Sequence, residues 1–204
     1  MKSYSSPSLL KKFLPVFQCI VFSILIFSLF SCGGSNKEPT GDALQKEKDA
    51  ILATIEKETE SFFSRDYATW KSTFVQEDYA FQAWSNRDGT FDASVGWEGI
   101  DKTVGSYITE NPVPDSAQRK VERKNIMYKF FGANVAFLTF DQFNSDPGIR
   151  GFLHSKETRL MEKVNGNWKI VAVSAFWDYV NPILGVKLKE IQKMDKESRG
   201  KGKL

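Results

Sequence analysis

Two charged residues near the C-terminal end of the chain could bind a small molecule. Glu157 and Arg159 lie two positions apart in a stretch whose residue types favour a β-strand. Their side chains therefore lie on one face of that strand. A guanidinium held by a carboxylate offers a planar set of donors that orients a polar or carboxylate ligand. The alternative is that the two charges only neutralise each other at the edge of a sheet.

Candidates for catalysis are few. Asp141 is a candidate base, because desolvation in an apolar cavity raises the pKa of a carboxyl group. His154 is the single histidine of the chain, and we expect it on the face opposite Arg159, packed against Trp177. A metal site is not expected, because one histidine and no spaced carboxylate–histidine cluster are present. We also expect no cofactor.

The dipeptide Asn165-Gly166 determines how the last two strands pair. It is typical of a two-residue type I′ turn, because both central residues need a positive φ. The turn pairs Val164 with Asn167, and an uninterrupted ladder then places Glu157 opposite Ser174. The ligand contacts expected from this register come from Glu157, Arg159, Ser174 and Phe176, with Trp84 and Trp97 as aromatic walls. The alternative for the two tryptophans is a place in the core, where aromatic residues of a small domain more often lie.

Hydrophobic periodicity predicts the elements that position these residues. A helical pattern begins at Asp42, a shorter one begins at Asp66, and a third covers 98–109. Extended patterns cover the ranges 79–85, 90–95, 119–131, 134–144, 151–164 and 167–179. Helices followed by long antiparallel strands predict an α+β fold, with one domain over residues 42–180.

The element order and two segments resemble a known superfamily. One segment is Val95-Gly96-Trp97-Glu98-Gly99-Ile100, and the other is the final hairpin, with Glu157-Thr158-Arg159-Leu160 followed by Asn165-Gly166-Asn167-Trp168-Lys169-Ile170-Val171. From about Ala43 to Tyr179 the chain resembles the nuclear transport factor 2-like superfamily, and within it the SnoaL-like domains. The resemblance implies N-terminal helices packed in a strongly bent antiparallel sheet, which forms a cone with a pocket at its open end.

The resemblance also bears on catalysis. Related domains often carry histidines on the last strand, at the positions that Ala172 and Ser174 occupy here. A histidine acting as general acid or base at those positions is therefore excluded. Some isomerases of the superfamily use an aspartate as the base, which is the role that Asp141 would take.

The N-terminal segment 1–31 has the layout of a bacterial lipoprotein signal peptide. Three lysines and no acidic residue precede a long apolar run, which ends in Leu-Phe-Ser-Cys-Gly-Gly around Cys32. This ending resembles a lipobox, and the resemblance implies that Cys32 is cleaved to the N-terminus and lipidated. A plain membrane anchor is the alternative reading of the same run. Both place the domain outside the cytoplasm, held to a bacterial membrane by the tether 32–41.

Removal of the signal changes the charge of the protein. The chain carries 28 basic and 25 acidic residues, and the signal takes three lysines with it. The mature chain is then formally neutral, so a nucleic-acid partner is not expected. The tail 181–204 is rich in lysine and polar residues.

Three functions are compatible with these observations. The first is a membrane-anchored domain that binds a small or peptide-like ligand without catalysis. The second is a small-molecule isomerase, dehydratase or hydrolase that uses a carboxylate base in its pocket. The third is a structural subunit of the cell envelope. We also expect a homodimer, formed through an aliphatic sheet face with Leu160, Val171 and Val173.

Overall fold

The computed structural model of this protein describes residues 37–114, 120–146 and 151–184. All of them belong to one compact unit, Asn36–Leu204. The expected signal segment 1–31, the lipidation residue Cys32, the first half of the tether and the tail from residue 185 lie outside the described residues. No helix within the described ranges is long and apolar enough to cross a membrane.

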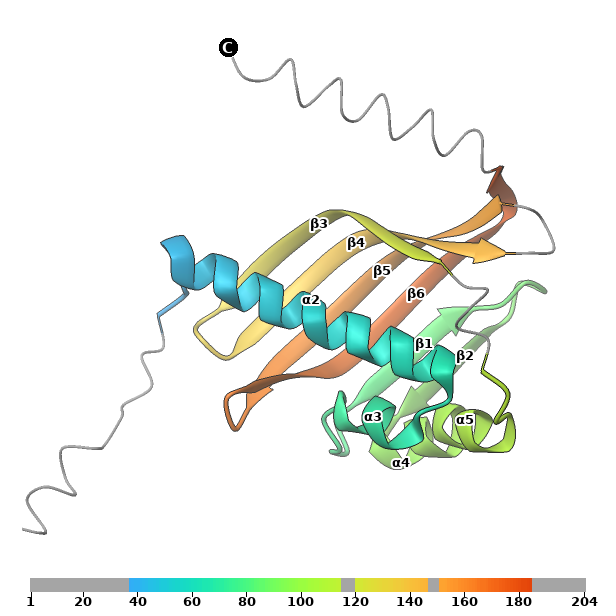
Figure 1. Ribbon diagram of the computed structural model, residues 1–204, viewed down its shortest axis with the longest axis horizontal. Coiled ribbons are helices and arrows are strands. Elements are labelled where there is room, and N and C mark those ends of the chain that lie inside the picture. The colour runs from blue at the N-terminus through green and yellow to red at the C-terminus, as the bar shows by residue number, and fades with distance from the viewer. Residues whose placement is uncertain (1–36, 115–119, 147–150, 185–204) are drawn as a thin grey trace, which may run out of the picture. The chain divides into compact units, whose positions relative to one another are not determined.

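Helix α2 (Gly41–Ser64) lies across one face of a curved sheet (Figure 1). Ile51 and Ile55, one helical turn apart, are fully buried against the sheet. The helix ends at Arg65, which takes a left-handed conformation with φ of 63°. Helix α3 (Tyr67–Ser72) then begins at Asp66 as the sequence predicts, because the Asp66 carboxylate accepts a hydrogen bond from the Thr69 N–H at 3.0 Å.

A third helical region covers one edge of the sheet. It consists of α4 (Gly96–Ile100), a π-helical turn η3 (Asp101–Gly105) and α5 (Ser106–Glu110). Ile100 and Ile108 bury their side chains in the core. The predicted helix over 98–109 is therefore present, although its middle turn is wider than an α-helix.

Six strands form the sheet, in the order β2-β1-β6-β5-β4-β3. Their bounds are β1 (Phe81–Ser85), β2 (Phe91–Val95), β3 (Val121–Phe131), β4 (Val135–Asp146), β5 (Gly151–Val164) and β6 (Asn167–Leu184). Neighbouring strands are antiparallel, except that β1 pairs with β6 in parallel. The predicted α+β fold with a bent, predominantly antiparallel sheet is confirmed, and the last strand continues past Tyr179.

Three register shifts interrupt the long strands. One lies in β3 between Lys124 and Met127, where Asn125 has φ of 53°. A second lies in the β5–β6 ladder between Phe152 and His154. The third lies nearer the turn of the final hairpin, where Met161 pairs with Ile170 but Leu160 pairs with Ala172, so that Val171 is an extra residue in β6. Such bulges bend a strand and increase its twist. They help to curve the sheet around α2.

The turn of the final hairpin follows the prediction, but the ladder beyond it does not. Asn165 and Gly166 have φ of 51° and 79°, and Val164 pairs with Asn167. Past Val171, each β6 residue is shifted by one position. Glu157 therefore lies opposite Ala175, not opposite Ser174 as expected. Because side chains alternate between the faces of a strand, this shift exchanges the two faces of β6.

An aromatic cluster that includes Trp70 of α3 forms part of the core. Trp70 is fully buried, with ring centroids 5.1 Å from Phe74 and 5.7 Å from Trp97. Trp97 is partly buried and packs against this core. The sequence predicts it as a wall of the ligand pocket, and the structure places it elsewhere.

Candidate functional site

A cavity of about 670 Å³ lies between α2, the third helical region and the inner face of the sheet. Six aromatic residues line it: Phe62, Phe63, Trp84, Tyr107, Trp177 and Tyr179. Its polar lining also includes Thr59, Asp92 and Thr103, and six further polar residues are called here the polar end: Glu58, Gln82, Gln142, Asn144, Glu157 and Arg159. The volume falls within the range of small-molecule sites, which run from about 300 to 1,000 Å³.

Glu157 and Arg159 form a buried ion pair in this cavity. Their side chains are 1% and 6% exposed, and Arg159 Nη1 donates to Glu157 Oε2 at 2.6 Å. The Ser155 hydroxyl donates to the other carboxylate oxygen at 2.6 Å. The guanidinium also donates to the Thr158 carbonyl at 3.0 Å and lies 5.4 Å from the ring centroid of Phe140. The side-by-side pairing expected from the sequence is therefore present, and water is excluded from it.

A second carboxylate, that of Glu58 on α2, lies near the pair. Burial raises the pKa of Glu58, although the positive charges of Arg159 and Arg123 oppose this effect. Arg123 from β3 donates to the Thr59 hydroxyl at 2.6 Å, and that hydroxyl lies 3.2 Å from Glu58 Oε2. The carboxylates of Glu58 and Glu157 and the guanidinium of Arg159 therefore lie near one another in the cavity wall, and Arg123, which does not line the cavity, lies close to Glu58.

The candidate residues chosen from the sequence do not include Glu58. One signal could have found it. Glu58 lies three residues after Ile55 and seven after Ile51, which are both buried. This spacing places Glu58 on the same stripe of the helix.

Four buried polar atoms at the polar end have no hydrogen-bond partner among the described residues. They are Gln82 Oε1, Gln142 Oε1, Asn144 Oδ1 and Arg159 Nε. The Gln82 and Gln142 residues are 8% and 6% exposed. An unsatisfied buried polar group costs about 1–3 kcal/mol. A ligand that supplies donors to the amide oxygens and an acceptor to Arg159 would recover that cost.

The register shift decides which predicted residues line the cavity. Glu157, Arg159 and Trp84 line it, as the sequence predicts. Ser174 and Phe176 do not, because they pair with Thr158 and Lys156 on the opposite face, where Phe176 is 63% exposed. The β6 residues that take their place, all missed by the sequence-based register, are Val173, Ala175, Trp177 and Tyr179.

Asp141 lies on the outer face of the sheet, away from the cavity. His154 Nε2 lies 2.7 Å from its Oδ1, Asn125 donates to its Oδ2 at 2.9 Å, and Lys156 forms an ion pair with it. Burial acts to raise the pKa of Asp141, but these partners outweigh burial and hold that pKa at about 2. Asp141 is therefore no candidate for a base in the cavity.

His154 shares that outer face, and its ring stacks on Phe143 at a centroid distance of 4.9 Å. The expected packing against Trp177 is wrong, because β5 pairs His154 with Asp178. Among the described residues, no group of three or more histidine, cysteine, aspartate or glutamate side chains could hold a metal ion.

Comparison with known proteins identifies the fold. No family model and no curated protein matches the sequence. The LinA-type3 hexachlorocyclohexane dehydrochlorinase of Novosphingobium barchaimii is 16% identical, with a TM-score of 0.51, over 69% of this chain and 92% of that one. The association domain of C. elegans CaMKII is 14% identical, with a TM-score of 0.51, over 66% of this chain and 98% of that one.

An NTF-2 like protein of unknown function from Shewanella oneidensis is also similar. It is 17% identical, with a TM-score of 0.47, over 64% of this chain and 98% of that one. The described part of the chain has the nuclear transport factor 2-like fold, also called cystatin-like, in which helices pack in a curved sheet. Identities this low show the fold alone, so function must be argued from the cavity.

Proposed function

We propose that this protein is a lipid-anchored, extracytoplasmic binding protein that holds a small or peptide-like ligand in the cavity without catalysing a reaction. The observation that carries the proposal is the buried Glu157–Arg159 pair beside unpartnered amide oxygens. An ion pair is a costly way to fill a core, because apolar residues of the same volume stabilise a fold at least as well. A role in positioning a ligand accounts for keeping it.

The polar end defines the head group of the ligand. The amide oxygens of Gln82 and Gln142 need donors, whereas Arg159 Nε needs an acceptor. A carboxamide, such as the amide of a peptide or of an N-acylated compound, supplies both. The aromatic walls favour a flat or apolar body. The ligand class is therefore a neutral amphipathic molecule with an amide-like head.

Among the described residues of the cavity, one carboxylate is suited to act as a base. Asp92 also lines the cavity, but it is exposed to solvent and accepts a hydrogen bond from Asn86. Glu157 already accepts hydrogen bonds from Ser155 and Arg159, and Asp141 is outside the cavity. Glu58 is the suited carboxylate, because burial raises its pKa and it lies close to two guanidiniums. It supports the second candidate function, a lyase or isomerase in which Glu58 removes a proton and Arg159 stabilises the resulting negative charge.

The anchoring part of the proposal is supported by the sequence around Cys32. Lipidation there would fix the domain to a bacterial membrane through buried acyl chains, each methylene contributing about 0.8 kcal/mol. Expression of Cys32→Ser in the native host tests it. The variant should remain unprocessed and unacylated, and a mature acylated product of the same mass would contradict the anchoring.

The outer face of the sheet supports a homodimer as part of this proposal. The residues expected to form the dimer face are not together there, because Val173 lines the cavity and Val171 is buried. Instead, the exposed apolar residues of that face are Phe91, Val95, Met127, Phe131, Phe137 and Phe176. Burying them between two copies would remove apolar surface from water. The same face would serve a structural envelope subunit, the third function.

Calorimetric titration with indole-3-acetamide tests the proposed ligand class. The mature chain is kept in maltoside micelles, so that partition into micelles is common to all variants. Gln142→Leu removes one amide acceptor and should weaken binding about fivefold, since one hydrogen bond contributes about 1 kcal/mol. Gln76→Leu, on the exposed surface, is the matched control and should bind as the wild type does. Equal affinities for all three proteins would refute the proposal.

A further inference from the structure

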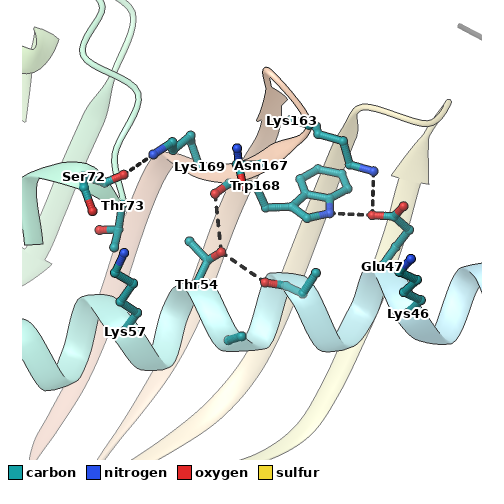
Figure 2. A pocket seen from close by; sticks show the side chains of 13 residues that line it. Lys46, Glu47, Thr54, Lys57, Ser72, Thr73, Lys163, Asn167, Trp168 and Lys169 are labelled. Carbon is teal, nitrogen blue, oxygen red and sulfur yellow. Dashed lines mark hydrogen bonds and ion pairs between the residues drawn. The ribbon is translucent and has the colours of Figure 1, made fainter. Parts of the chain in front are cut away.

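A second cavity, separate from the aromatic one, lies on the other side of α2. It has a volume of about 460 Å³ and lies between residues 46–57 of α2, the end of α3 and the β5–β6 turn. Figure 2 shows four of its lining residues to be lysines, with the indole of Trp168 between them: Lys46, Lys57, Lys163 and Lys169. This cavity is called the lysine groove below.

The lysine groove has more positive charge than its own carboxylate can neutralise. Glu47 accepts from Lys163 Nζ at 2.6 Å and from Trp168 Nε1 at 2.7 Å. The carboxylate of Glu47 is therefore already engaged by these two partners. Burial opposes these partners, yet they keep the pKa of Glu47 below its ordinary value. Lys163 is therefore paired with Glu47, and the positive charges of the other three lysines are not neutralised by Glu47.

Lys46, Lys57 and Lys169 form no ion pair with a carboxylate of the described residues. Lys169 donates instead to the Ser72 carbonyl. Burial, followed by the positive charge of Lys57, lowers the pKa of Lys169. Lys57 and Lys169 lie at the same end of the groove (Figure 2), where their positive charges repel each other. A concave site whose lining is mainly positive attracts an anion.

We propose that the lysine groove binds a phosphate group between Lys57 and Lys169. A phosphate carries enough negative charge to offset both ammonium groups, and lysine binds phosphate as a point charge without bidentate geometry. Thr73 lines the same end of the groove (Figure 2) but donates its hydroxyl proton to the Trp70 carbonyl at 2.6 Å, so the two ammonium groups are the donors of the site. Lys46 lies eleven residues before Lys57 on α2, about 16 Å away along the helix, and adds to the positive field.

The phosphate could belong to an anionic phospholipid or be free in solution. The position of the groove makes the lipid source accessible, because α2 begins nine residues after Cys32. Nine extended residues span at most about 30 Å. The phosphate site stands whether or not the aromatic cavity binds a ligand, since the two cavities share no lining residue.

Titration of the mature chain in maltoside micelles tests the site with three probes: inorganic phosphate, dihexanoyl phosphatidylglycerol and dihexanoyl phosphatidylcholine. The indole N–H signal of Trp168, assigned by its loss in Trp168→Phe, reports on the groove. We expect saturable shifts with phosphatidylglycerol and at least tenfold weaker binding of phosphatidylcholine, whose choline offsets the phosphate charge. Saturation by inorganic phosphate as well would assign the site to free phosphate, and its failure would assign it to the lipid.

Lys57→Glu is the decisive variant, and Lys102→Glu, the same change at an exposed position outside the groove, is its matched control. Lys57→Glu should weaken binding at least tenfold, and Lys57→Gln should have a smaller effect in the same direction. Lys102→Glu should change affinity less than twofold. No saturable shift with any probe, or equal losses in Lys57→Glu and Lys102→Glu, would overturn the proposal.

Discussion

Replacing Glu157 by glutamine should destabilise the protein far more than a usual loss of one surface charge. The substitution preserves the shape of the side chain but removes the charge that compensates Arg159, whose side chain is 6% exposed. Breaking a buried pair in this way costs about 3–5 kcal/mol. Two features reduce that cost here: the glutamine oxygen can still accept one hydrogen bond, and the Glu58 carboxylate is near enough to interact with Arg159.

We therefore expect a loss of about 2–4 kcal/mol in the free energy of unfolding. For a domain of this size, 1 kcal/mol shifts the melting temperature by about 2–4 °C. Calorimetry or fluorescence should then show a midpoint lower by about 10 °C, and a ligand for the cavity should partly restore it. The control is Glu38→Gln, which removes an exposed partner of Lys129 and should have almost no effect.

Two results would contradict this reasoning. One is a midpoint for Glu157→Gln that lies within about 1 °C of that for Glu38→Gln, which would mean that water reaches the pair. The other is a double variant, Glu157→Leu with Arg159→Met, that is as unstable as the single variant. Removing both charges should restore most of the stability, because apolar residues of similar volume replace a buried pair at little or no cost.

Three further predictions concern charge and aromatic packing. The pKa of Asp141 in the folded state is about 2, below its ordinary value of 3.8. The ionised carboxylate therefore stabilises the fold above pH 4, by on the order of 2 kcal/mol, and this contribution disappears as the pH falls toward 2. Asp141→Asn should flatten the acid limb of the pH–stability curve. The pH dependence of the Glu58 contribution has the opposite sign. Because its pKa is raised in the folded state, Glu58 stabilises the fold at low pH, and this contribution is lost as the pH rises. Glu58→Gln should therefore leave the free energy of unfolding at pH 7 unchanged or higher. Trp97→Ala, at a side chain packed against the core, should cost about 3–5 kcal/mol, whereas Trp84→Ala should mainly weaken binding of indole-3-acetamide.

The fold could be predicted from the sequence because its strongest signals are local. Alternating strands, the Asp66 cap and the Asn165-Gly166 turn each depend on a few adjacent residues, and all three are present. The charged pair was also predictable, since alternation along one strand places Glu157 and Arg159 together without reference to any other strand.

The rest of the cavity could not be predicted because it depends on an interruption of the ladder. The extra residue Val171 has no distinctive sequence signal, yet it exchanges the faces of β6. Ser174 and Phe176 were assigned to the cavity for that reason alone. Trp97 illustrates a different limit, because an aromatic residue fits a core as well as a pocket and only tertiary packing decides between them.

Native mass spectrometry of the protein purified from its own host tests the central claim most directly. The wild type should retain a noncovalent small molecule, and that molecule should be recovered with unchanged mass after prolonged incubation, since binding involves no reaction. Arg159→Ala, purified in the same way and folded, should carry none. A wild type with no bound molecule, or a molecule retained equally by Arg159→Ala, would contradict a ligand held by the polar end of the cavity. A bound molecule converted to a product in the wild type but not in Glu58→Gln would show an enzyme instead.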